Sequence, residues 1–128
     1  MAAMSGIHSA HPDWKIIATE TASPSNSRGI YTTLSQYGKS GDYQCTAYDT
    51  NAVSWGNTAR ESWWYTIKDD FVSGEFIWTG FDYIGEPTPW NGTDKGSVSG
   101  DKLAVPNSSY FGVIDTAGFE KDSFYFYT

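Results

Sequence analysis

The stretches Asn57-Thr58-Ala59-Arg60-Glu61 and Glu75-Phe76-Ile77-Trp78-Thr79 decide the fold of this 128-residue chain. In the first stretch, Thr58 is followed three residues later by Glu61, which is the capping-box pattern of a helix start. The second stretch predicts a short strand. Apolar side chains that recur every four residues predict one apolar face on the helix. They are Ala59, Trp63, Ile67 and Phe71.

An earlier apolar run, Trp14-Lys15-Ile16-Ile17-Ala18-Thr19, predicts a strand that ends at Glu20. A continuous apolar run of this length suits a strand buried on both faces of a parallel sheet. Strand, crossover helix and strand together imply a right-handed βαβ unit. Functional loops in such folds follow the carboxyl ends of the strands, which is where Glu20, Trp78 and Asp82 lie.

The remaining chain predicts an N-terminal tail, a long loop and a short last helix. Residues 1–12 are expected to be a tail or the end of a preceding helix, and residues 13–128 one continuous segment. Residues 29–57 predict a long ordered loop. Tyr110–Asp115 predicts a third short extended piece, and Asp122 or Ser123 is expected to cap a last helix that begins with Phe124. One βαβ unit cannot cover both faces of its sheet, so we expect it to pair with more chain.

Composition excludes several classes of function. The chain has 8 basic and 15 acidic residues and a net charge of −7, which argues against nucleic acid and an anionic membrane as partners. No apolar run reaches the roughly 18 residues of a membrane span. Residues 1–12 lack the features of a secretory signal, and no compartment is predicted. A single cysteine, Cys45, excludes an internal disulfide and is expected to be a buried small residue.

Aromatic residues form 17% of the chain. Their rings suit a site that stacks on sugar faces, and they equally suit an aromatic core or a partner interface. The densest cluster runs from Trp78 to Pro87 and includes Asp82 and Glu86. It is either a platform for a polyhydroxylated ligand or an aromatic turn packed on the rim of the fold.

Glu20 is the first candidate for chemistry, because a carboxylate that closes an apolar strand is costly to bury without a partner. It is either a nucleophile or base facing a cleft, or an ordinary solvated residue. Arg28 either orients a carboxylate or lies on the surface.

The other short motifs give little evidence of a functional site. His8 and His11 lack a third ligand nearby and are expected to be solvated. No Gly-rich phosphate turn is present, and we expect no metal and no cofactor. The sequons at Asn91 and Asn107 are interpreted as chance matches.

Four ordered segments resemble the bacterial β-galactosidases of glycoside hydrolase family 2. Thr19–Ser23 with Ser27-Arg28-Gly29 resembles the nucleophile segment. Tyr48-Asp49 with Trp55-Gly56 resembles the loop that follows it. The other two segments, which resemble the last barrel strand and the lead into the final barrel helix, are Gly74–Pro89 and Ser109–Phe119 with Lys121-Asp122.

The resemblance implies an α/β fold that is the last quarter of a (β/α)8 TIM barrel. It implies hydrolysis of terminal β-galactosides through a covalent glycosyl-enzyme. Glu20 takes the position of the nucleophile and Trp78 that of a tryptophan near the sugar, whereas Asp82 and Glu86 are carried over only as residues that shape the site.

The sequence also departs from the family pattern. Thr19 stands where the family often has serine, and nothing matches the Asn-Glu segment that holds the acid/base carboxyl group. The chain is therefore expected to need the rest of the barrel, from the same or another polypeptide, and to be inactive alone. Two alternatives remain: a non-enzymatic carbohydrate-binding module, typically a β-sandwich, and a chain that completes a barrel supplied by another polypeptide.

Overall fold

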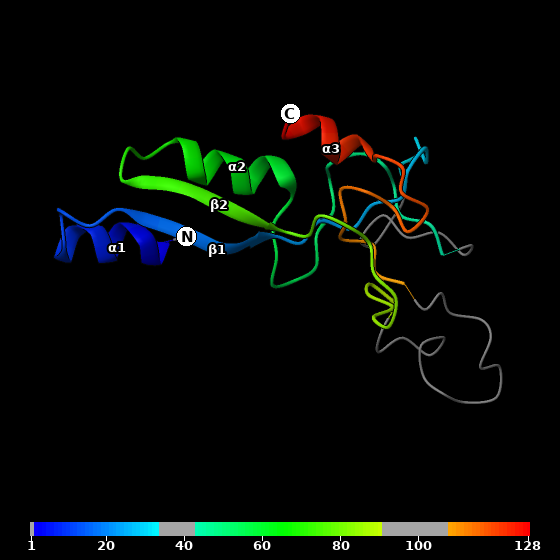
Figure 1. Cartoon of the computed structure of the whole chain (residues 1–128), viewed down its shortest axis with the longest axis horizontal. Coiled ribbons are helices and arrows are strands. Elements are labelled where there is room, and N and C mark those ends of the chain that lie inside the picture. Colours follow the sequence, from blue (N-terminus) through cyan, green and yellow to red (C-terminus); the bar gives the residue numbers. More distant parts are fainter. Residues whose placement is uncertain (1, 34–42, 91–107) are drawn as a thin grey trace.

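The computed structural model describes residues 2–33, 43–90 and 108–128. Its elements in chain order are α1 (Ala2–Ala10), β1 (Ile16–Ala22), α2 (Ala59–Ile67), β2 (Val72–Trp78) and α3 (Asp122–Phe126). β1 and β2 pair in parallel, with α2 between them in the chain. The predicted strand–helix–strand unit is therefore confirmed. Figure 1 shows α2 along the sheet and α1 beside β1. None of the described helices is long and apolar enough to cross a membrane.

β1 extends further than the apolar run predicts. Thr21 and Ala22 continue the ladder by pairing with Ile77 and Trp78. Glu20 therefore lies inside the strand, and its predicted place at the strand end is wrong. The reason is that pairing with β2, more than fifty residues away, decides where the strand stops.

A bulge in β1 lies at Glu20. Between the ladder pairs that begin at Ala18 and Thr21, β1 contributes two residues and β2 only one. Side chains alternate between the two faces of a regular strand, yet Thr19 and Glu20 are both exposed. An extra residue of this kind disrupts the ladder locally and re-aims the side chain that it carries.

One face of the sheet is left uncovered by the described residues. Ile17 is 53% exposed and Phe76 is 63% exposed, although both are apolar strand residues. The prediction that β1 is buried on both faces is therefore wrong. α2 packs on both strands, but a single helix covers a single face.

The start of α2 is held by two sets of side chains. The Thr58 hydroxyl accepts from the Glu61 N–H (3.3 Å), and the Glu61 carboxylate accepts from the Thr58 N–H (3.1 Å), which confirms the capping box. The Asp49 carboxylate accepts from the N–H groups of Ala59 and Arg60, each at 2.9 Å. The free N–H groups of the first turn are thereby satisfied.

The buried side of α2 differs from the predicted one. Trp63 is 39% exposed and Ile67 is 54% exposed, so only Ala59 of the predicted apolar face is buried in the helix. The side chains that α2 buries are small, which lets the helix approach the sheet closely. They are Ala59, Ser62 and Thr66.

α2 also ends earlier than predicted. Lys68 is its C-cap, and Phe71 lies outside the helix. The Phe71 carbonyl accepts from the Ile16 N–H at 2.9 Å, which draws this residue into the start of the sheet.

The C-terminal part packs against the segment after β2. Tyr110–Asp115 forms isolated bridges and no strand: Ile114 bridges Phe81 in parallel and Glu120 in antiparallel orientation. α3 begins at Asp122 with Lys121 as its N-cap, so the predicted caps and the start at Phe124 are wrong. Lys121 takes this position because its N–H donates to the Val113 carbonyl at 2.8 Å.

The best-buried side chains lie among the loops beyond the strand ends. They include Phe111, Lys121, Thr46, Thr88 and Cys45, all less than 2% exposed. Backbones approach closely there, since a Cβ at Gly112 would lie 2.1 Å from the Asp82 nitrogen. This loop core, rather than the sheet face, positions the candidate site.

We predict that Thr58→Ala lowers the free energy of unfolding by about 1 kcal/mol, because it leaves the Glu61 N–H without its acceptor. Urea unfolding of the chain, followed by far-UV circular dichroism, measures this loss. Ser54→Ala is the matched control at an exposed position and should change stability by less than about 0.5 kcal/mol. Equal effects of the two substitutions would contradict the capping role.

Candidate functional site

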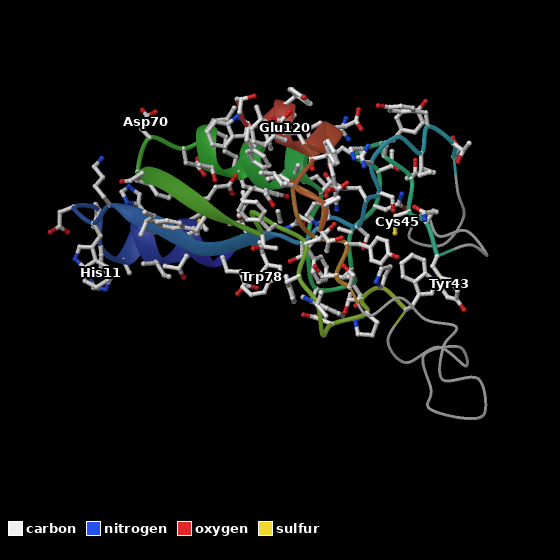
Figure 2. All side chains as sticks on the ribbon, turned by 45° about the vertical axis from the view of Figure 1, so that its right-hand side comes forward. His11, Tyr43, Cys45, Asp70, Trp78 and Glu120 are labelled. Carbon is white, nitrogen blue, oxygen red and sulfur yellow. The ribbon has the colours of Figure 1, made fainter. Side chains whose placement is uncertain are left out.

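The candidate residues lie where β1 and β2 end and the loops gather. Figure 2 shows Trp78 at this junction, away from His11 and Asp70 at the other end of the sheet. Ala22 pairs with Trp78, and the Ser23 N–H donates to the Trp78 carbonyl at 3.3 Å. Glu20 and Trp78 are thus on neighbouring strands near the same end of the sheet.

Glu20 lines a cavity of about 220 Å³. Trp55, which is 69% exposed, lines the same cavity together with Met4 and Asn57. Within the described part of the chain, the Glu20 carboxylate has no hydrogen-bond or ion-pair partner. The cavity therefore joins an unengaged carboxylate to an exposed indole.

The chain turns sharply directly after β1. Ala22 and Ser23 both have positive φ, 67° and 78°, a left-handed conformation that costs non-glycine residues about 1–3 kcal/mol each. The turn is held by the Asn57 N–H, which donates to the Ala22 carbonyl at 2.8 Å. Gly56 permits this approach, since a Cβ there would lie 2.6 Å from the Ala22 oxygen. Such strain concentrates at functional sites.

Trp78 and Glu86 are joined through Tyr83. The Trp78 ring, 38% exposed, meets the Tyr83 ring edge to face with centroids 6.0 Å apart. The Tyr83 hydroxyl donates to the Glu86 carboxylate, which also accepts from the Thr88 hydroxyl at 3.0 Å. Burial, reinforced by the bond to Glu86, raises the pKa of Tyr83 to about 12. The phenol therefore stays a donor at neutral pH and holds Glu86 within its own loop.

Asp82 forms a buried ion pair with Lys121. The Lys121 Nζ lies 2.5 Å from Asp82 Oδ2, and the two side chains are 2% and 7% exposed. Asp82 Oδ1 accepts from the Gly112 N–H at 2.7 Å and from the Ser109 hydroxyl at 3.4 Å. Asp82 is thus bound within the loop core, and its role in shaping a sugar site stays a prediction.

The Lys121 ammonium also donates to two backbone carbonyls. They belong to Asn26 (3.0 Å) and Tyr110 (3.4 Å). Burial lowers the pKa of Lys121 and raises the pKa of Asp82, and in each case the charge of the other partner opposes the shift. An ion pair held at such a desolvation cost leaves an uncompensated charge when either partner is removed.

Arg28 orients a carboxylate, one of the two roles expected of it. Its Nε donates to Asp115 Oδ2 at 2.8 Å, and its guanidinium lies 4.7 Å from the centre of the Phe119 ring. Burial raises the pKa of Asp115, but hydrogen bonds from the Phe119 N–H, Arg28 and the Ala117 N–H outweigh it and lower the pKa overall. With its side chain 48% exposed, Arg28 ties two surface loops together.

The remaining candidates lie elsewhere. The rings of His8 and His11 stack on Phe71 and Trp14, and Cys45 is buried, as predicted. No group of three His, Cys, Asp or Glu residues in the described ranges could hold a metal ion. Asn91 and Asn107 lie outside the described residues.

Two residues at the site were not proposed from the sequence as site residues. Trp55 was noted only as part of a resembling loop, and its spacing from Glu20 gives no sign that both line one cavity. Lys121 was noted only in the segment before the last helix. A lysine in a mixed-charge stretch is ordinarily solvated, so only the resemblance could have drawn attention to it.

Comparison with known proteins finds that the chain is similar to parts of two longer proteins. Beta-galactosidase BoGH2A of Bacteroides ovatus is 39% identical over 91% of this chain, which corresponds to 14% of that protein. A putative beta-glucuronidase of Formosa agariphila is 36% identical over 64% of this chain and 7% of its own length. No family model matches.

The chain is therefore similar to segments of glycoside hydrolases. More particularly, the resemblance to family 2 β-galactosidases that the motifs predict is confirmed. The chain spans about one seventh of the length of the first relative.

The buried ion pair gives a stability prediction. Lys121→Met should lower the free energy of unfolding by about 3–5 kcal/mol, because it leaves the Asp82 carboxylate buried without its counter-charge. The double variant Lys121→Met/Asp82→Asn should lose about 1–3 kcal/mol less than the sum of the two single variants. Urea unfolding of all three chains measures the coupling.

Lys68→Met serves as the control for loss of a lysine. Lys68 pairs with Asp69 at 3.2 Å on the surface, with about a third of its side chain exposed, so its loss should cost at most about 1 kcal/mol. Additive losses at Lys121 and Asp82 would show that the pair is not coupled.

Proposed function

We propose that this chain is part of a retaining β-glycosidase, and that Glu20 is its nucleophile. The observation that carries the proposal is the unengaged Glu20 carboxylate, which lines a cavity shared with Trp55. The related proteins support a glycosidase, since they are described as a beta-galactosidase and a putative beta-glucuronidase. Terminal β-galactosides are the favoured substrate because the relative from Bacteroides ovatus, which matches 91% of the chain, is a beta-galactosidase.

The proposed reaction proceeds in two displacements at the anomeric carbon. The Glu20 carboxylate attacks that carbon while the bond to the leaving oxygen breaks, and a second carboxyl group protonates this oxygen. Water, deprotonated by the second group, then attacks the same carbon and releases Glu20, so that the sugar keeps its configuration. The two carboxyl groups of such enzymes lie about 5–5.5 Å apart.

The aromatic residues would bind the sugar. Trp55, which lines the same cavity as Glu20, and Trp78, on the neighbouring strand, would offer their exposed rings to the apolar face of a pyranose. Asp82 and Glu86 would act indirectly. Asp82 holds the loop after β2 to the core, and Glu86 fixes Tyr83, which in turn contacts the Trp78 ring.

The second carboxyl group would come from outside this chain, because no segment resembles the Asn-Glu of the family. β1, α2 and β2 would form strand seven, helix seven and strand eight of a (β/α)8 barrel, and α3 the start of helix eight. The exposed side chains of Ile17 and Phe76 support this arrangement, because in a closed barrel each strand face is covered.

The uncovered sheet face also favours the second candidate, a chain that completes a barrel supplied by another polypeptide. Both candidates use the same residues and differ only in whether the rest of the barrel is covalently attached. A carbohydrate-binding β-sandwich is disfavoured, because such modules pair antiparallel strands in two sheets, whereas β1 and β2 are parallel.

The purified 128-residue chain should not hydrolyse a nitrophenyl β-galactoside above the rate of buffer. Loss of an acid/base group alone commonly removes about 10²–10⁴-fold in rate, and the cleft that positions the sugar would also be incomplete. Release of nitrophenolate measures the rate. Turnover by the chain that disappears in its Glu20→Gln variant would contradict the requirement for the rest of the barrel.

In the enzyme assembled from this chain and the rest of its barrel, Glu20→Gln should lower kcat by at least about 10⁴-fold. A 2-fluoro-galactoside with a dinitrophenolate leaving group should label the wild-type peptide that contains Glu20, as seen by mass spectrometry, because this leaving group needs no acid. Glu120→Gln is the matched control, since Glu120 is exposed and bonded to Tyr125. Labelling of another carboxylate in the wild-type enzyme would refute the assignment.

A further inference from the structure

The Lys121 ammonium joins three separate parts of the chain at one buried point. It contacts the carboxylate of Asp82 in the loop after β2, the carbonyl of Asn26 in the loop after β1, and the carbonyl of Tyr110. All three donor positions of the ammonium are thereby used. Lysine is rarely buried to this extent unless it is paired, so the arrangement constrains all three segments together.

From this point, short paths of backbone lead to both strand ends. Asn26 lies six residues after Glu20, and Asp82 lies four residues after Trp78. The Tyr110 carbonyl also accepts from the Asn26 N–H at 3.1 Å, and the Ile114 carbonyl accepts from the Asp82 N–H at 2.8 Å. Displacement of the ammonium would therefore be passed to both loops.

We propose that Lys121 is a positioning residue, whose buried ammonium fixes the loop after β1 against the loop after β2 and so sets the placement of Glu20 relative to Trp78. Its relevance to sugar chemistry rests on the proposed function. The placement of the two strand ends does not, because it follows from the contacts of Lys121 within the chain.

Loss of a positioning residue disturbs one part of the structure, whereas loss of a generally stabilising residue weakens the whole fold. The hydrogen bond from the Ser23 N–H to the Trp78 carbonyl joins the two strand ends, and neither group contacts Lys121 in the described chain. The bond from the Ile16 N–H to the Phe71 carbonyl closes the opposite end of the sheet. Loss of positioning should loosen the first bond and spare the second, whereas a general loss of stability should affect both alike.

The test is hydrogen exchange by NMR on the full chain and its Lys121→Met variant, with Lys68→Met as the control. We expect the Ser23 amide to exchange about tenfold faster or more in Lys121→Met, as for loss of a charge-assisted hydrogen bond, with the Ile16 amide less affected. The indole N–H signal of Trp78, assigned with a Trp78→Phe chain, should shift only in the Lys121 variant. Equal acceleration of both amides with an unmoved indole signal would overturn the proposal.

A second variant covers the outcome that Lys121→Met does not fold. Lys121→Met/Asp82→Asn carries no buried unpaired charge but still lacks the ammonium that bridges Asn26 to Asp82. It should give the same two signatures, and their absence there would equally overturn the proposal. Neither readout needs a sugar, so failure to label Glu20 would reject the glycosidase and leave the positioning role standing. In the assembled enzyme, misplacement of this kind should lower kcat by about 10²-fold.

Discussion

A buried ammonium group is the constraint on which the loop core depends. Lys121 sits where a small domain ordinarily places an apolar side chain, and a cation there needs a counter-charge and carbonyl oxygens. Asp82, Asn26 and Tyr110 supply them, from loops that lie up to 95 residues away from Lys121 in the sequence. The strand ends are consequently ordered by polar contacts rather than by the apolar packing of a helix on a sheet.

The turn after β1 depends on a close approach between two stretches of backbone. Ala22 and Ser23 adopt left-handed conformations that are unfavourable in isolation, and the neighbouring loop offsets this cost with the Asn57 N–H and the space left by Gly56. The bulge at Thr19 and Glu20 lies immediately before this turn. The bulge and the two left-handed residues together place the Glu20 carboxylate where a regular strand would not.

Local patterns predicted the elements well, and long-range contacts caused the errors. The capping box at Thr58 was readable because its partners lie three residues apart, and the parallel order followed from strand, helix and strand. The exposed side of α2 was mispredicted because four-residue spacing marks a stripe without saying what packs on it. The position of Glu20 inside β1 depends on the pairing of Ala22 with Trp78, and the burial of Lys121 depends on its hydrogen bond to the Asn26 carbonyl. Neither contact leaves a trace in the sequence near the residue itself.

The three candidate carboxylates show why a site has to be argued from partners rather than from residue type. Asp82 is balanced by Lys121 and bonded to the Gly112 N–H, and Glu86 accepts from Tyr83 and Thr88. A carboxylate that is engaged in this way has lost much of its freedom to react, because its lone pairs and charge already stabilise the fold. Glu20 has no such partner in the described chain and lines a cavity. An unengaged carboxylate that shares a cavity with an exposed indole keeps its nucleophilic lone pairs for a ligand, which is why we propose the chemistry for Glu20 and a structural role at the site for the other two.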